Sequence, residues 1–325
     1  MSILIYGAAG YTGSMVARHA KATALDIVLG GRDAAKLAPI AAELGVTWRA
    51  FPLAGKLPAE ALSGVQVLLN CAGPFARTAE PLMRACIEAG IHYLDITAEI
   101  GVYRLAERLG ANAGAAGVML MPGVGWDVVP TDCLAMQMAS RVENPKSLRI
   151  ALQVAGSMSR GSALSAGEIV AAGVLARVAG ELVQTVDGQP QSFDFGQGMV
   201  SCFPLSFGDL VTAWRSTGIP DIAMYVNVTG DAFPTDNLAS MPDGPTPQER
   251  AAQPARAVVE ITGVGGAVIR SIIETVNGYS YTPLAAVEAA RRVSSGTVRP
   301  GFETPSRVFG AGFAEAIPGT RVFGI

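Results

Sequence analysis

Residues 3–13 decide the fold, and they read Ile3-Leu4-Ile5-Tyr6-Gly7-Ala8-Ala9-Gly10-Tyr11-Thr12-Gly13. A short apolar run leads into a glycine-rich turn, and a helical pattern begins directly after it. The free N–H groups and the positive dipole end of a helix N-terminus attract an anion, and glycines let a phosphate approach the backbone. The spacing is GxxGxxG rather than GxGxxG, but its strand–turn–helix context predicts a site for the diphosphate of a dinucleotide. A glycine-rich turn without a ligand is the alternative interpretation.

We assign this predicted diphosphate contact to six residues of the turn, namely Gly7, Ala9, Gly10, Tyr11, Thr12 and Gly13.

The composition is apolar and only weakly charged. Of 325 residues, 50% are hydrophobic and 16% are charged, with a net charge of −3. This length suits two domains, or one domain with a large insertion. The apolar content predicts an extensive buried surface between subunits, so we expect a homodimer. The chain has no basic block and no apolar run long enough to span a membrane, so we expect neither nucleic acid nor a membrane span.

The four cysteines share no CxxC spacing, which predicts reduced thiols in a cytoplasmic protein. The N-terminus also lacks the basic flank and apolar region of a signal peptide. With only two histidines and no cysteine–histidine cluster, we expect no metal site.

The first 125 residues alternate between apolar runs and amphipathic helical patterns. Strands are predicted at 3–6, 26–29, 47–51, 65–70, 92–95 and 118–121, and helices at 11–20, 34–44, 79–89 and 100–113. Apolar strands between such helices predict a parallel sheet covered on both faces, a doubly wound, Rossmann-type α/β fold.

The pattern changes after residue 128. A strand is predicted at 147–155, a helix at 163–183, a surface loop at 241–254, a hairpin of 257–262 with 267–276, and a last helix at 284–293. We therefore divide the chain into a dinucleotide-binding Rossmann domain at 1–128, an inserted α/β or α+β substrate and dimerisation domain at 129–282, and a C-terminal segment at 283–325 that packs back on the first domain.

The end of the second predicted strand favours NADP over NAD. Rossmann domains that bind NAD carry an acidic residue there, which accepts hydrogen bonds from the ribose 2′-hydroxyl. Here the strand ends in Gly30-Gly31-Arg32, and a guanidinium pairs well with a 2′-phosphate. The next residue, Asp33, argues against this assignment, but it also suits the N-cap of the following helix. We assign Gly31 and Arg32 to the cofactor; an exposed turn residue is the alternative interpretation of Arg32.

Several further motifs resemble one family. They are Gly31-Arg32, Asn70-Cys71-Ala72-Gly73-Pro74-Phe75, the stretches at 92–99 and 122–132, Gly278-Tyr279 and Thr304-Pro305. In this order, and together with the glycine-rich turn, they resemble the saccharopine dehydrogenase-like oxidoreductases, including short bacterial members and the trans-acting enoyl reductases. The resemblance is strongest over residues 1–135. It implies an NADP-binding Rossmann domain, an inserted substrate domain, a C-terminal return to the first domain and commonly a dimer.

The motif at 70–75 follows a central strand, at the sheet edge where open α/β sheets bind ligands. We assign its Asn70, Ala72, Gly73, Pro74 and Phe75 to the ribose and nicotinamide of the cofactor. A plain turn, the alternative, does not explain why the polar Asn70 closes an apolar strand.

Two interpretations stay open for the acidic residues after the next strand. Asp95 and Glu99 line the substrate cleft, or Thr97 and Glu99 cap the helix predicted at 100–113.

We assign catalysis to Asp127 and Arg160. Asp127 follows the sixth predicted strand, where it would orient the substrate or relay a proton. Arg160 lies in the polar segment 157–162 and would bind an anionic group of the substrate; an exposed surface arginine is its alternative interpretation. We expect Asp132 to cap a helix at 133–140.

These features predict an NADP-dependent oxidoreductase that transfers a hydride to or from a small C=C, C=N or C=O substrate, apolar or mono-anionic. The alternative is a non-catalytic NADP(H)-binding protein that senses redox state or serves as a subunit. A third hypothesis, an acyl-phosphate or semialdehyde reductase that uses Cys71 or Cys133, lacks a suitably placed cysteine–histidine pair.

The substrate cleft is predicted to be mostly apolar. Between residues 155 and 235 the arginines Arg160, Arg177 and Arg215 are too few for a tricarboxylate, and Arg177 falls within the predicted helix. Large apolar side chains outnumber them in this segment, namely Met158, Leu164, Met199, Phe203, Leu205, Phe207, Trp214 and Tyr225.

Overall fold

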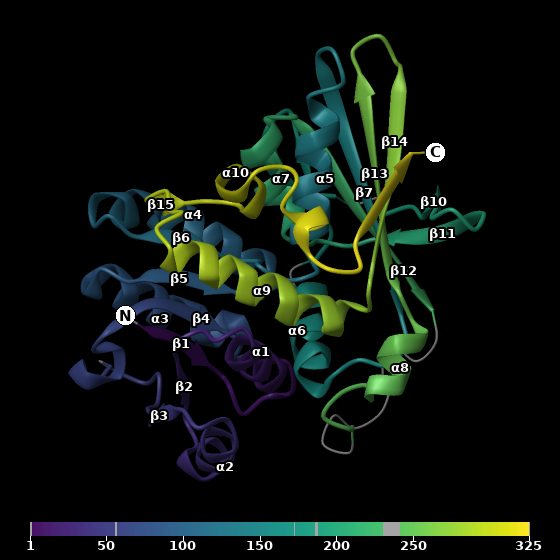
Figure 1. The fold of residues 1–325 in the computed structure, drawn as a ribbon. Helices are drawn as coiled ribbons and strands as arrows, with labels where there is room; N and C mark the ends of the chain where they lie inside the picture. The colour runs from purple at the N-terminus through teal and green to yellow at the C-terminus, as the bar shows by residue number, and fades with distance from the viewer. Residues whose placement is uncertain (1, 56, 172, 186–187, 230–240, 325) are drawn as a thin grey trace.

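A computed structural model of the chain describes residues 2–55, 57–171, 173–185, 188–229 and 241–324. It contains two β-sheets with helices packed around them (Figure 1). In these described ranges no helix is both long and apolar enough to cross a membrane.

The first sheet is parallel, with the strand order β15-β6-β5-β4-β1-β2-β3. Its strands are β1 (Ser2–Tyr6), β2 (Ile27–Gly31), β3 (Thr47–Ala50), β4 (Val65–Asn70), β5 (His92–Asp95), β6 (Met119–Met121) and β15 (Gly301–Phe302). Its helices are α1 (Tyr11–Ala22), α2 (Ala34–Leu44), α3 (Phe75–Ala89) and α4 (Ile100–Ala115), with a short 3-10 turn at Ala59–Leu62. The strand order reverses between β1 and β4, which is where doubly wound sheets bind ligands.

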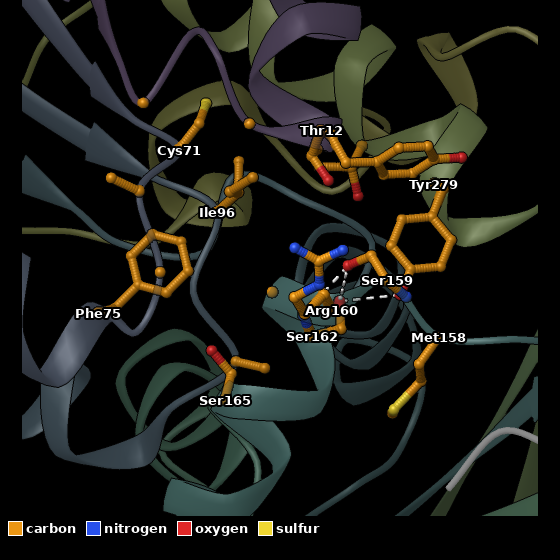
Figure 2. Close-up of a pocket in the computed structure, with 18 of the residues that line it drawn as sticks. Thr12, Cys71, Phe75, Ile96, Met158, Ser159, Arg160, Ser162, Ser165 and Tyr279 are labelled. Atoms are coloured by element: carbon orange, nitrogen blue, oxygen red, sulfur yellow. Dashed lines mark hydrogen bonds between the residues drawn. The ribbon is translucent and has the colours of Figure 1, made fainter. Parts of the chain in front are cut away.

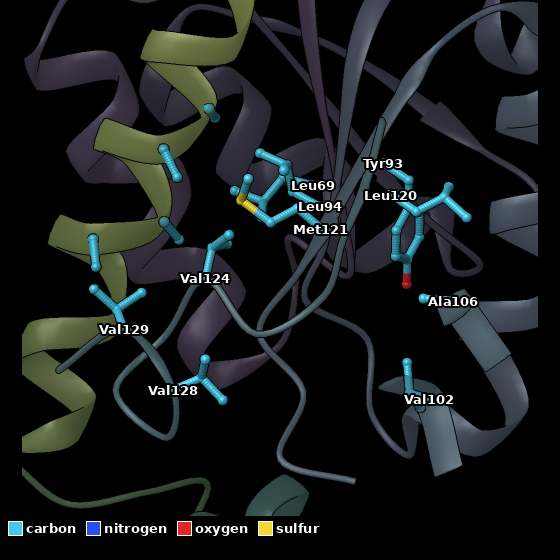
Figure 3. Packing of buried hydrophobic residues seen from close by; sticks show 14 of the residues in the cluster. Leu69, Tyr93, Leu94, Val102, Ala106, Leu120, Met121, Val124, Val128 and Val129 are labelled. Carbon is cyan, nitrogen blue, oxygen red and sulfur yellow. The ribbon is translucent and has the colours of Figure 1, made fainter. Parts of the chain in front are cut away.

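Both faces of this sheet are buried. Figure 3 shows Tyr93 and Leu120 pointing toward α4, while Leu69, Leu94 and Met121 point to the opposite face. On that opposite face lies α9 (Gly278–Ser294), which packs against α1 and β4. A strand buried on both sides needs apolar residues at successive positions, which explains the unbroken apolar runs of the sequence.

The second sheet is mixed and follows the order β10-β11-β12-β7-β13-β14-β16, with a β8–β9 hairpin attached to β12. The strands β7 and β12 are parallel, and the other pairs are antiparallel. The strands are β7 (Pro145–Ala155), β8 (Leu175–Val178), β9 (Glu181–Gln184), β10 (Gln191–Asp194), β11 (Met199–Pro204), β12 (Asp221–Thr229), β13 (Ala255–Gly263), β14 (Val268–Thr275) and β16 (Arg321–Gly324). The predicted β13–β14 hairpin is confirmed.

The remaining helices are α5 (Val129–Ala139), α6 (Arg160–Ala171), α7 (Asp209–Thr217), α8 (Pro247–Ala252) and α10 (Pro305–Phe309), with a 3-10 turn at Ala314–Ala316. Both α5 and α7 pack against the second sheet. The predicted fold class, a Rossmann-type parallel sheet with a second α/β unit, is confirmed.

The helix predicted at 163–183 is wrong beyond Ala171. Gly173 has a φ of 72°, a left-handed conformation that ends helices, and the β8–β9 hairpin follows it. Arg177 lies in β8 rather than in a helix, where it donates to the backbone oxygens of Leu210 and Gly180. A short apolar run fits a helix and a strand equally well, so its spacing misled the prediction.

Two smaller predictions also need correction. Asp132 does not cap its helix, because α5 begins at Val129; its carboxylate accepts hydrogen bonds from Ser216 Oγ and from the backbone N–H of Ser306. The segment 241–254 is not all loop, because it contains α8, which starts with a proline at its favoured first position.

Candidate active site

A cavity of about 990 Å³ opens at the carboxyl ends of β1, β2 and β4. One wall contains most of the residues assigned to the cofactor, namely Gly7, Ala9, Gly10, Tyr11, Thr12, Gly31, Arg32, Ala72, Gly73 and Phe75. The other wall comes from the second sheet and α6, and it includes Arg160; Asp127 also lines the cavity. The fold therefore brings the predicted cofactor and catalytic residues to one space.

Three assigned residues do not line the cavity but shape it. Asn70 is fully buried; its Oδ1 accepts from the backbone N–H of Ala72 at 2.9 Å, and its Nδ2 donates to the hydroxyl of Tyr93. Pro74 is the N-cap of α3. Gly13 lies under the turn, since a Cβ there would fall 2.2 Å from the carbonyl oxygen of Gly7.

The glycine-rich turn fits a diphosphate. A Cβ on Gly7 would lie 2.7 Å from the backbone nitrogen of Ala72, so the β1–α1 turn and the β4–α3 loop touch here. Gly10 is exposed and has an ordinary extended backbone, with φ −78° and ψ 167°. Among the described residues no side chain caps the N-terminus of α1, so its N–H groups face the cavity free for an anion.

The end of β2 fits a 2′-phosphate. The carboxylate of Asp33 accepts from the backbone N–H groups of Ala35 and Lys36, at 3.0 and 3.3 Å, which confirms its predicted role as N-cap. Arg32 is exposed at the cavity, with Lys36 beside it. Arg77 on α3 also lines the cavity, and the sequence did not predict this position.

Residues 3–121 match the family described as the saccharopine dehydrogenase NADP binding domain. This part of the chain is similar to saccharopine dehydrogenase NADP-binding domains. The match confirms the resemblance drawn from the sequence motifs, and it confirms NADP as the cofactor of the domain.

Known proteins resemble the chain at two levels. A trans-acting enoyl reductase of Mycobacterium leprae is 35% identical over 150 residues, and one of Mycobacterium tuberculosis H37Rv is 31% identical over 148 residues. Each match covers 43% of this chain, and it spans about a third of the relative's length, 36% and 35%. Apo saccharopine dehydrogenase (L-Glu forming) of Saccharomyces cerevisiae shares the fold, with a TM-score of 0.65 over 100% of this chain and 99% of that one, at 13% identity.

Asp127 is placed by its neighbour Trp126. The backbone N–H of Trp126 donates to Thr282 Oγ1 and its indole N–H donates to Thr275 Oγ1, which ties the loop to α9 and β14. The side chain of Asp127 is partly buried at the cavity, and this loss of water contact raises the pKa of its carboxyl to about 6. A carboxyl with this pKa exchanges a proton readily near neutral pH.

Neither interpretation of the acidic residues after β5 is confirmed. Neither Asp95 nor Glu99 lines the cavity. The carboxylate of Glu99 accepts from the backbone N–H groups of Phe75 and Ala76, so it caps α3 rather than α4. Asp95 is buried as well, and burial raises the pKa of its carboxyl to about 7. Both carboxylates hold the loops that surround the cofactor site.

The far wall of the cavity is mostly apolar, as predicted, but only some of the singled-out residues contribute to it. Of the eight apolar residues singled out, Met158, Leu205 and Phe207 line the cavity, whereas Leu164, Met199 and Phe203 are exposed on the surface. Trp214 packs against Arg177, and Tyr225 against Phe193. Hydroxyl groups complete the wall, from Ser157, Ser159, Ser162, Ser165, Tyr279 and Thr282.

Arg160 begins α6 and faces the cavity together with Tyr279. Figure 2 shows both residues across the cavity from Phe75 and Cys71. The guanidinium donates to the carbonyl oxygen of Met241 at 2.7 Å and pairs with Asp243 at 3.2 Å. Tyr279 is a site residue that was not predicted, although the Gly278-Tyr279 motif is a sequence signal that points to it.

The thiols do not suit the cysteine hypothesis. Cys71 lines the cavity, but burial and the nearby carboxylate of Asp95 raise the pKa of its thiol. Burial likewise raises the pKa of the Cys133 thiol well above its usual value. Since the thiolate is the nucleophile, both groups are poorly suited to acyl-enzyme chemistry.

Proposed function

We propose that this chain is an NADP-dependent oxidoreductase that transfers a hydride to or from a small C=C, C=N or C=O substrate, apolar or mono-anionic. One observation carries the proposal: a single cavity joins the diphosphate turn and the β4–α3 loop to Asp127 and Arg160. The relatives named enoyl reductases favour C=C among the three bonds. A homodimer, and the domain division at residues 128 and 282, belong to the same proposal.

The proposed role of each residue follows from its position in the cavity. When bound, NADPH supplies the hydride. The turn from Gly7 to Thr12 holds the diphosphate, Arg32 pairs with the 2′-phosphate, and the β4–α3 loop positions the nicotinamide. Arg160 binds an anionic group of the substrate, and Asp127 gives or takes the proton that accompanies the hydride.

The first test is NADPH oxidation against a panel of enones, imines and keto acids. We expect turnover with at least one class, and Asp127→Ala and Arg160→Ala should each lower it while the Kd for NADPH stays unchanged, because neither residue lies on the cofactor wall. Tight NADPH binding without turnover on any compound would favour the redox-sensing alternative.

Asp127 also predicts a pH dependence of activity. Its carboxyl loses a proton as the pH rises through about 6, so kcat/KM for reduction should fall above that pH. The residual kcat/KM of Asp127→Asn should not show this fall above a pH of about 6. A pH profile that is the same in both proteins would exclude Asp127 as the proton donor.

The same carboxyl predicts a pH-dependent stability. Its pKa is higher in the folded protein than in the unfolded chain, so the contribution of this carboxyl to the free energy of unfolding is greatest at low pH and falls as the pH rises to about 6. Asparagine stays neutral throughout. Asp127→Asn should therefore stabilise the protein by about 1–3 kcal/mol at pH 8 and hardly at all at pH 4, as measured by urea unfolding. Equal effects at both pH values would contradict the raised pKa.

A further inference from the structure

Three hydroxyl groups form a chain on the α6 wall of the cavity (Figure 2). The hydroxyl of Tyr279 accepts from the backbone N–H of Ser159 at 2.8 Å and donates to Ser162 Oγ, also at 2.8 Å. The hydroxyls of Ser159 and Ser162 lie 3.0 Å apart, and Ser159 Oγ accepts from the backbone N–H of Ser162.

One of the three hydroxyl protons is not used in the hydrogen bonds among Tyr279, Ser159 and Ser162. Three hydroxyls carry three protons but make two contacts with one another, so one proton has no acceptor in the described part of the protein. Ser162 Oγ accepts from both neighbours, and the side chain of Ser159 is buried while that of Ser162 is partly exposed. The free proton is therefore on Ser162, and it faces the cavity.

Ser162 lies between the diphosphate turn and the β4–α3 loop, so its proton faces the region between these two parts of the cofactor site. The ring of Tyr279 lies 5.5 Å from that of Tyr11, on the diphosphate turn. One helical turn after Ser162, the Oγ of Ser165 lies 3.4 Å from the point where a Cβ on Gly73 would be. Beside them the Nε of Arg160 is buried without a hydrogen-bond partner among the described residues.

We propose that Ser162 donates a hydrogen bond to a carbonyl oxygen of the substrate, with Tyr279 and Ser159 as its positioning residues. This inference rests on the proposed function and narrows its substrates to carbonyl compounds, reduced at C=O or at a C=C conjugated to it. The substrate carbon gains the hydride from bound NADPH, and the π electron pair moves to the carbonyl oxygen. Ser162 stabilises the negative charge there, and the Asp127 carboxyl gives up the proton that completes the reduction and regains one from water.

The contacts that Ser162 already accepts prepare it for this role. A hydroxyl that accepts two hydrogen bonds is polarised and becomes a better donor. It is also held in place before the substrate arrives, so no reorganisation is needed as charge develops. Ser165 provides a contrast, because its hydroxyl donates to Glu99 Oε1 at 2.6 Å and has no proton left for a ligand.

The test uses 4-nitrophenolate, an oxyanion with a visible absorption band, added to the NADP⁺-loaded protein. We expect Ser162→Ala to raise the Kd of the phenolate roughly 10- to 100-fold and to remove the shift of its band on binding, since a charge-assisted hydrogen bond is lost. Ser162→Thr should retain both, and Tyr279→Phe should show a smaller loss. Ser165→Ala is the matched control, with a phenolate Kd like that of the wild type.

Three outcomes would overturn the proposal: no phenolate binding by the wild type, an unchanged Kd in Ser162→Ala, or equal losses in Ser162→Ala and Ser165→Ala. The Kd for NADP⁺, measured on each variant, shows that the cofactor site is intact. Ser162-dependent phenolate binding without NADPH turnover on any compound would contradict the oxidoreductase proposal instead and leave the oxygen site standing.

Discussion

Gly10→Val is expected to abolish NADP(H) binding and to leave the protein folded. Gly10 is exposed at the cavity, its backbone is extended, and a Cβ there would meet only the carbonyl oxygen of Gly7, at 3.3 Å. A valine side chain would therefore fit the fold but occupy the space that the diphosphate needs. Loss of about two charge-assisted contacts should raise the Kd roughly 10²- to 10⁴-fold, measured by calorimetry.

Gly13→Val is the matched comparison, three residues further along. Here a Cβ would lie 2.2 Å from the Gly7 carbonyl oxygen, inside the packed start of α1, so we expect a marked loss of thermal stability. If Gly10→Val kept the wild-type Kd, the diphosphate would have to bind elsewhere. If it unfolded like Gly13→Val, the space seen around Gly10 would not exist.

The parallel sheet was predictable from the sequence because its signals are local. The strands Val65–Asn70 and His92–Asp95 and the helix Ala34–Leu44 have the predicted bounds. The strands are short, mainly apolar segments that end at a polar residue, and the helix is an amphipathic repeat followed by a glycine. The N-cap Asp33 and the C-terminal Gly45 of α2 could likewise be predicted from the residues next to them in sequence.

The second sheet was harder to predict because distant residues define it. The two-residue strand β15 exists only because it pairs with β6, and β16 only because it pairs with β14. The β8–β9 hairpin was mistaken for helix because its apolar positions fit both periods. Pairing across the sheet, which the local sequence does not reveal, decided between the two.

The candidate site also has a part that is predictable from local sequence and a part that depends on contacts between distant residues. The diphosphate turn is continuous in sequence, so its residues were assigned together, and most of them line the cavity. The contact between Tyr279 and Ser162 joins residues 117 positions apart, and Glu99 caps α3 from 24 positions away. Such contacts depend on how α6 and α9 pack in the fold. The spacing of residues in a single sequence does not predict this packing.

Arg32→Ala should erase most of the preference for NADPH over NADH. The exposed guanidinium of Arg32 lines the cavity at the end of β2, while Asp33 is occupied as a helix cap and does not compete for the ribose. A charge-assisted contact is worth ~1.5–3 kcal/mol, so the ratio of the two Kd values should fall roughly 10- to 100-fold, with NADH binding almost unchanged. Arg18→Ala is the control, because this arginine of α1 is paired with Glu43 and does not line the cavity. A wild-type protein that binds NADH more tightly than NADPH would refute the role given to Arg32, since no other residue at the end of β2 was assigned to the 2′-phosphate.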